Sequence, residues 1–311
     1  MKKSIIITLI AALGIVNMAN AQQDPQYTHY MLNTIVVNPA FAGAGNVLSV
    51  SALHRSQWIG LDGAPKTQTV SIESPLTERL GAGLSVVNDD IGEGTVQQTS
   101  FDFAFSYTIP ASREGSLAFG LNVGGDLMNV DFTQLVNYGV EPNLPNIDSK
   151  FSPNVGLGVY YYQEKFFAGV SVPSLLETEH FDNSSDGTSF LAKDRMTYYL
   201  ISGYRYEINQ NLVLQPGFLV RAVSGGPVQV DLTANMTFND KFSFGAAYRL
   251  DSAVSALFGV KFAEKFLVGL AYDVETSTLG STQFNDGSFE VFLRYDFINR
   301  INRRNVSGRF Y

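Results

Sequence analysis

Residues 228–238 read Val228-Gln229-Val230-Asp231-Leu232-Thr233-Ala234-Asn235-Met236-Thr237-Phe238. Every second residue is apolar, and every residue between them is polar. Because successive side chains of a β-strand point to opposite faces, this period of two gives one apolar face and one polar face. On a helix the same residues would spread apolar groups around the whole circumference, so the stretch predicts a strand.

The same alternation recurs along most of the chain and predicts an antiparallel β-architecture of 14 strands. Most of these segments are near the roughly 9–11 residues that a tilted strand needs to cross a bilayer. An even number of strands is typical of bacterial outer-membrane barrels. The expected strands are residues 47–54, 67–75, 81–89, 97–109, 116–126, 154–163, 166–173, 195–207, 212–222, 227–238, 242–250, 253–263, 266–276 and 286–297.

The connections between these strands differ in length in a regular way. Short turns such as 164–165 and 239–241 follow even-numbered strands, whereas the long connections all follow odd-numbered strands. Outer-membrane barrels have short periplasmic turns and longer outer loops. The pattern therefore predicts a transmembrane barrel with both chain ends in the periplasm. The long connections are 55–66, 90–96, 127–153, 174–194 and 277–285.

Composition supports this fold class and excludes several functions. The chain has 311 residues, a net charge of −8 and only 16% charged residues, against roughly 25% in soluble domains. The absence of cysteine excludes disulfides, Cys-ligated metals and a lipid-modified Cys. The acidic balance argues against a nucleic-acid partner. A soluble sandwich or propeller is the alternative, but no repeat of 40–50 residues is present.

The first 21 residues have the features of a secretory signal peptide. Lys2 and Lys3 precede an apolar stretch, and Ala19-Asn20-Ala21 fits a cleavage site, so we expect cleavage between Ala21 and Gln22. No later window of 18 apolar residues occurs. The expected organisation is a signal peptide (1–21), a leader (22–45), an outer-membrane barrel (46–298) and a basic periplasmic tail (299–311).

The leader, residues 22–45, is apolar and rich in Asn, Pro and Gly. Either it packs into the lumen as a plug or it forms a loose lid at the rim, and we favour the plug. Tyr27, Tyr30 and Asn38 are then its lumen-facing anchors. Asn38 precedes Pro39, which favours an extended turn because the residue before proline avoids the helical region.

The first outer loop contains the only tryptophan, Trp58. Aromatic residues at a barrel rim usually belong to the interfacial girdle, whereas Trp and Arg are also favoured anchors in protein interfaces. Both interpretations stay open. The residues that would contact a partner or close the lumen in this loop are Arg55, Trp58, Gly60, Asp62 and Pro65.

Two further clusters suggest chemistry only weakly. His54, Ser56 and Asp62 are close in sequence, but nucleophilic catalysis requires a defined geometry that sequence proximity does not supply. We therefore assign no catalytic residue, no metal ligand and no cofactor. Loop carboxylates can also bind calcium through oxygen ligands, although solvated loop acids are the simpler interpretation. These acids are Asp89, Asp90, Glu93, Asp182 and Asp186.

Several blocks identify a family. The chain begins its mature part with Asp-Pro-Gln-Tyr-Thr-His-Tyr-Met-Leu-Asn (24–33) and Asn-Pro-Ala-Phe-Ala-Gly (38–43), followed by His-Arg-Ser-Gln-Trp-Ile-Gly-Leu-Asp-Gly-Ala-Pro-Lys-Thr-Gln-Thr (54–69). Together these blocks resemble the opening of the PorP/SprF family of type IX secretion outer-membrane proteins. One departure is Gly-Ser-Phe-Glu at 287–290, where the family has Gly-Ser-His-Glu, so any role of that His is absent here. Further similar blocks are residues 81–89, 154–162, 169–176, 203–206 and 245–249.

The resemblance implies a non-enzymatic outer-membrane barrel linked with export by the type IX system. It also implies that the barrel holds exported proteins, including gliding adhesins, at the cell surface. The expected partners are an exported client protein, other type IX components and outer-membrane lipid. The polar lumen alone would equally suit a porin-like or hydrophobic-solute uptake channel. From their length, we expect residues 127–153 and 174–194 to hold the client.

Overall fold

The computed structural model describes residues 25–45, 47–134, 146–177, 196–224, 226–277 and 285–298. The expected signal peptide and the basic tail lie outside these residues and stay predictions. Within the described residues, no helix is long and apolar enough to cross a membrane.

Almost all of the described chain is β-strand, with three short 3-10 helices, η1 (Thr34–Val36), η2 (Pro39–Phe41) and η3 (Phe132–Gln134). The strands are β1 (Leu48–Ser56), β2 (Lys66–Pro75), β3 (Leu80–Ile91), β4 (Val96–Pro110), β5 (Ser116–Val130), β6 (Ile147–Tyr162), β7 (Phe166–Val172), β8 (Thr197–Tyr204), β9 (Tyr206–Asn209), β10 (Leu212–Val223), β11 (Gln229–Phe238), β12 (Phe242–Arg249), β13 (Ala253–Phe262), β14 (Phe266–Glu275) and β15 (Ser288–Phe297).

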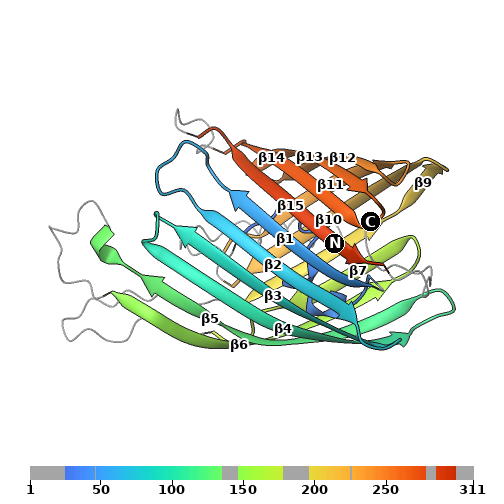
Figure 1. Cartoon of the computed structure of the whole chain (residues 1–311), viewed down its shortest axis with the longest axis horizontal. Helices are drawn as coiled ribbons and strands as arrows, with labels where there is room; N and C mark the ends of the chain where they lie inside the picture. The colour runs from blue at the N-terminus through green and yellow to red at the C-terminus, as the bar shows by residue number, and fades with distance from the viewer. Residues whose placement is uncertain are drawn as a thin grey trace, which may run out of the picture.

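The strands close into one antiparallel barrel (Figure 1). Except for β8 and β9, each strand pairs with its neighbour in sequence. β1 pairs with β15 from Leu48–Phe297 to Ser56–Phe289, so the sheet has no open seam. β8 and β9 both pair with β10 and are separated only by Arg205, which makes them one interrupted barrel strand. The predicted barrel of 14 strands is therefore confirmed.

As predicted, side chains alternate along the strands, so that the outer face of the wall is apolar and the inner face is polar. On β11, Leu232 and Met236 are 47% and 40% exposed, whereas Asp231, Thr233 and Asn235 are buried. An apolar outside with aromatic girdles near both ends is typical of a barrel in a membrane. Exposed aromatic residues near one end are Tyr107, Phe166, Tyr204, Tyr206, Phe238, Phe242, Phe262, Phe266 and Phe297, and near the other Phe151, Tyr198, Tyr248, Tyr272 and Phe289.

The two ends of the barrel differ in their connections. At the end where β1 begins, the strands are joined by turns such as 163–165 and 239–241, and we call this the turn end. At the opposite end, the loop end, the connections include 57–65 and 276–287. Asn239 and Asp240 both have φ of +51°, as a tight hairpin turn with the twist of its strands requires.

The β5–β6 hairpin projects beyond its neighbours at the loop end (Figure 1). β5 continues to Val130 and β6 begins at Ile147, so the connection expected at 127–153 is in fact only 131–146. Asp148, Ser149 and Lys150 are polar on both faces of the added part of β6, so the sequence there has no period of two.

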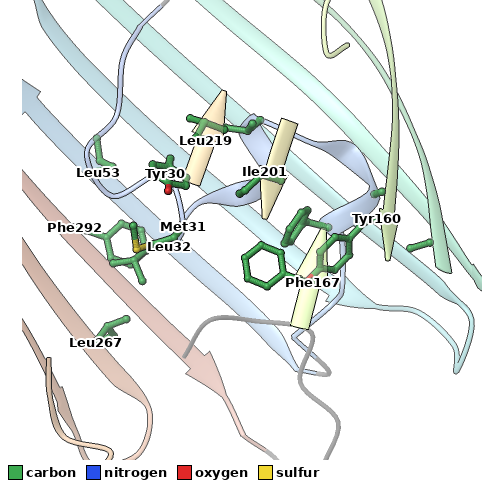
Figure 2. Packing of buried hydrophobic residues seen from close by; sticks show 14 residues of the cluster. Tyr30, Met31, Leu32, Leu53, Tyr160, Phe167, Ile201, Leu219, Leu267 and Phe292 are labelled. Atoms are coloured by element: carbon green, nitrogen blue, oxygen red, sulfur yellow. The ribbon is translucent and has the colours of Figure 1, made fainter. Parts of the chain in front are cut away.

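The core of the molecule lies between the leader and the inner face of the wall. Buried Tyr30, Met31 and Leu32 pack in one cluster with Leu53 and Phe292 of the wall (Figure 2). The same cluster continues through Phe41, which stacks on Tyr160 of β6 with ring centroids 3.8 Å apart. Other wall residues of this cluster are Ala118, Phe167, Ile201, Leu219 and Leu267.

Candidate functional site at the contact of leader and wall

An ionic network joins the start of the leader to the first and last strands. Arg55 of β1 places Nη2 2.7 Å from Asp273 Oδ2 of β14 and Nη1 3.3 Å from Glu290 Oε2 of β15. All three side chains are at most 1% exposed. Thr28 of the leader inserts between them, because its hydroxyl accepts from Arg55 Nη1 at 2.9 Å and donates to Asp273 Oδ2 at 2.8 Å.

Glu290 receives further hydrogen bonds from the leader backbone. The N–H groups of Thr28 and His29 donate to its two carboxylate oxygens at 2.9 and 2.7 Å. His29 Nδ1 lies 2.8 Å from Oε1, and it donates there because an ionised carboxylate only accepts. Breaking a buried ion pair leaves an uncompensated charge and is costly, so this network holds the start of the leader against β1, β14 and β15.

The expected leader anchors Tyr27 and Tyr30 both reach the wall. The Tyr30 hydroxyl lies 3.1 Å from Thr233 Oγ1 of β11, and Thr69 of β2 donates to the Tyr27 hydroxyl at 3.3 Å. Asn33 accepts from Ser71 of β2 at 2.8 Å. The middle of the leader thus contacts strands on two different parts of the wall.

The third expected anchor, Asn38, is fully buried between the leader and two strands. Its Oδ1 accepts from Ala40 N at 2.9 Å and caps η2, which begins at Pro39. Its Nδ2 donates to the carbonyls of Val159 on β6 and Val170 on β7, at 3.2 and 3.3 Å. Asn38 itself has extended backbone, as expected for the residue before proline.

The wall makes room for this part of the leader with glycines that face inward. A Cβ on Gly158 of β6 would lie 2.0 Å from Asn38 Oδ1, and one on Gly120 of β5 would lie 2.1 Å from Ala40 N. A Cβ on Gly81 of β3 would lie 2.0 Å from the carbonyl oxygen of Ala42. A side chain at Gly120 or Gly81 would displace the leader backbone, and one at Gly158 would displace the side chain of Asn38.

The residues expected together in the first outer loop lie in different places in the structure. Arg55 is not in that loop, which corrects the expectation, because β1 continues to Ser56 and turns Arg55 inward. Trp58 stays at the rim, where its indole donates to Glu275 at 3.3 Å and its backbone to Ser288 Oγ at 3.2 Å. Gly60 and Asp62 are exposed in the same loop and Pro65 is buried before β2.

The rim loops are tied to one another. Ile59 N donates to Gly287 O at 2.8 Å and Asp286 N to Ile59 O at 2.7 Å, which joins the β1–β2 and β14–β15 connections. Gly92 N donates to Gly63 O at 2.9 Å and adds the β3–β4 connection.

Thr28, His29, Asp273 and Glu290 belong to this network but were not among the predicted site residues. Asp273 and Glu290 have a signal, since charged residues at inward positions of membrane-spanning strands are costly and therefore usually functional. For Thr28 and His29 the sequence gives no comparable signal, because the leader has no periodicity from which to infer where their side chains point.

The weaker clusters do not assemble into sites. His54 Nε2 lies 3.1 Å from Ser56 Oγ on the exposed face of β1, and Asp62 lies in the loop beyond. Asp89 accepts from Thr67 and Asp90 from Gly94 N, while Asp182 and Asp186 lie outside the described residues. Hydrogen bonds from Thr133 and Gln134 lower the pKa of exposed Asp131 in the β5–β6 connection. No group of three or more His, Cys, Asp or Glu placed to hold a metal is found in the described part.

A closed antiparallel barrel with an apolar exterior and a polar interior is the architecture of bacterial outer-membrane proteins. The chain belongs to the family of type IX secretion system membrane protein PorP/SprF, whose family model matches residues 19–295. It is thus an outer-membrane protein of the type IX secretion system. No curated protein matches the chain.

Solved structures with a similar fold are outer-membrane barrels. The CymD monoaromatic hydrocarbon channel is 13% identical, with a TM-score of 0.51 over 88% of this chain and 94% of that chain. The toluene transporter TbuX of Ralstonia pickettii is 9% identical, with a TM-score of 0.49 over 84% and 92%. Omp33 of Acinetobacter baumannii is 10% identical, with a TM-score of 0.48 over 81% and 100%. At such identities the likeness concerns the fold alone.

Proposed function

We propose that this protein is a non-enzymatic barrel, closed by its own leader, that holds an exported client protein such as a gliding adhesin at the cell surface. Membership of the type IX secretion family supports the link with export. In this proposal the mature chain begins at Gln22, after removal of the signal peptide.

One observation carries the proposal of a closed barrel. The leader is tied by hydrogen bonds to β1, β2, β6, β7, β11, β14 and β15, and its side chains from Thr28 to Thr34 are buried. A segment packed in the lumen would obstruct a channel for free diffusion. A surface anchor, by contrast, does not need an open lumen. The client is then held by the outer loops, for which we propose the β5–β6 and β7–β8 connections because they are long.

Conductance tests the closure. The full chain in planar bilayers is expected to give no steady conductance, and deletion of residues 22–45 is expected to open a pore. Steady conductance of the full chain would favour the alternative of an uptake channel. Unchanged conductance after the deletion would overturn closure by the leader and leave the anchoring role in place.

Client retention tests the anchoring. Shortening 131–146 and 173–196 together is expected to release the client into the medium without reducing the amount of barrel in the outer membrane. The matched control shortens 276–287, another loop-end connection, and is expected to retain the client. A client that stays on the surface after the double shortening would overturn the assignment to these loops.

A further inference from the structure

We infer that the leader threads the barrel along its length, so that its N-terminal end opens toward the outside of the cell while its C-terminal end lies at the periplasmic rim. The inference rests on which wall residues the leader meets in turn, and it does not depend on a client.

The start of the leader lies at the loop end. Gln26 Nε2 donates at 3.1 Å to Oε1 of Gln229, the first residue of β11. Gln229 in turn donates to Asp231, which pairs with Arg249 Nε at 2.7 Å. Gln229 follows the β10–β11 connection at the loop end, so the described part of the leader begins near this end.

The following residues descend through the barrel. Thr28 and His29 meet Glu290 near the loop-end start of β15, and Tyr30 meets Thr233, four positions further along β11 than Gln229. Four residues of a strand span roughly 13 Å, at about 3.3 Å for each residue. The wall contacts of the leader therefore move away from the loop end between residues 26 and 30.

The leader ends at the turn end. Ser106, near the end of β4, donates to Ala42 O at 2.6 Å. Gly43 has φ of +71°, and a Cβ there would lie 2.7 Å from the carbonyl oxygen of Ser74 beside the β2–β3 turn. Only glycine suits both the backbone conformation and this close approach, so the chain turns here into β1.

The short turns of outer-membrane barrels face the periplasm, so the loop end faces outward. For the described start of the leader, this arrangement differs from the expectation that both chain ends are periplasmic, and the expectation stays a prediction for the residues outside the described part. In this arrangement, a molecule that binds at the outer mouth reaches residues 25 and 26 before the rest of the described leader, residues 27–45.

Single cysteines test this arrangement without interference, because the chain has none of its own. In Gln26→Cys, a small membrane-impermeant maleimide added to intact cells is expected to label the cysteine. In the matched variant Ala44→Cys, at the other end of the leader and also half-buried, labelling is expected only after the periplasm is opened.

For both variants, labelling is read only in the gel band that migrates as folded, unheated barrel. Labelling after denaturation measures the total amount of reactive cysteine, to which the labelling of intact cells is compared. Labelling of Ala44→Cys but not Gln26→Cys from outside would overturn the inference, as would equal labelling of both or no outside labelling of Gln26→Cys. None of these outcomes depends on conductance or on client release, so the proposed function is tested separately.

Discussion

The two ends of the leader are held by opposite means. At residues 28–29 the contact is ionic and hydrogen-bonded, with Arg55, Asp273 and Glu290 arranged around the leader backbone. At residues 38–42 the contact is steric, because glycines let the leader approach the wall more closely than any side chain permits. The first contact is therefore sensitive to charge, and the second is sensitive to volume.

The largest effect is expected from Arg55→Met. The change leaves two buried carboxylates without their cation, and breaking a buried ion pair in this way costs about 3–5 kcal/mol. The free energy of unfolding in lipid vesicles, measured with urea, should fall by this amount. His54→Met, on the exposed face of the same strand, is the control and should change little. Similar losses for both variants would show that the ionic contact does not fix the leader.

Gly120→Ala should have the next largest effect. The new Cβ meets the backbone of Ala40 rather than a flexible side chain, so the cost lies near the upper part of the range for overpacking, about 3 kcal/mol. The control is Gly259→Ala on β13, where the Cβ meets only the hydroxyl of Ser243. Proteolysis of the leader in folded barrels should increase for Gly120→Ala alone. An unchanged leader in that variant would contradict the steric contact.

Asn38→Ala tests whether the contact at residues 38–42 also depends on hydrogen bonds. The change removes the cap of η2 and two hydrogen bonds to the wall, and leaves a buried N–H without its acceptor, at a cost of about 1–3 kcal/mol. The melting temperature of the folded barrel, followed by gel migration, should fall. Asn38→Ser supplies a neutral cap oxygen but not the two donated hydrogen bonds, so it should recover only part of the loss. Full recovery would assign the whole effect to the cap.

Tyr30→Phe should have the smallest effect. It removes one hydrogen bond to Thr233 but keeps the ring in the core, at a cost of about 0.5–1.5 kcal/mol. Thr233 keeps its hydrogen bond to Gly217 O, so no hydroxyl is left unpaired. Urea unfolding measures the difference, and a loss as large as that of Arg55→Met would mean that the two ends are not held differently.

Most of the fold could be predicted because the membrane imposes a period of two on the sequence. Val228–Phe238 shows this period and forms β11, from Gln229 to Phe238. The extension of β6 to Ile147 was missed because Asp148 to Lys150 project beyond the apolar band and have no apolar face. The break at Arg205 was missed because it depends on the partner strand. The register against β10 is the same on both sides of Arg205, but Pro216 of β10 lies between the flanking pairs and has no N–H to donate to the ladder.

The site was less predictable because it joins strands, whose side chains alternate with a period of two, to the leader, which has no periodicity. The inward direction of Arg55 follows from the parity of Ser49, Ser51 and Leu53, once β1 is known to extend past residue 54. The leader has no period, so nothing in its sequence indicates that Thr28 and His29 would lie against Glu290. That pairing depends on how the closed barrel surrounds the leader.

The ionic network also sets an order of events during folding. Thr28 is separated from Asp273 by 245 residues and from Glu290 by 262 residues. The leader precedes all the described strands in the sequence, yet its anchoring carboxylates are on the last two of them, β14 and β15. Such distant contacts form late, since a long stretch of chain must be ordered before they are gained. The start of the leader therefore gains its ionic contacts only once β14 and β15 are in place, although the leader precedes every described strand in the sequence.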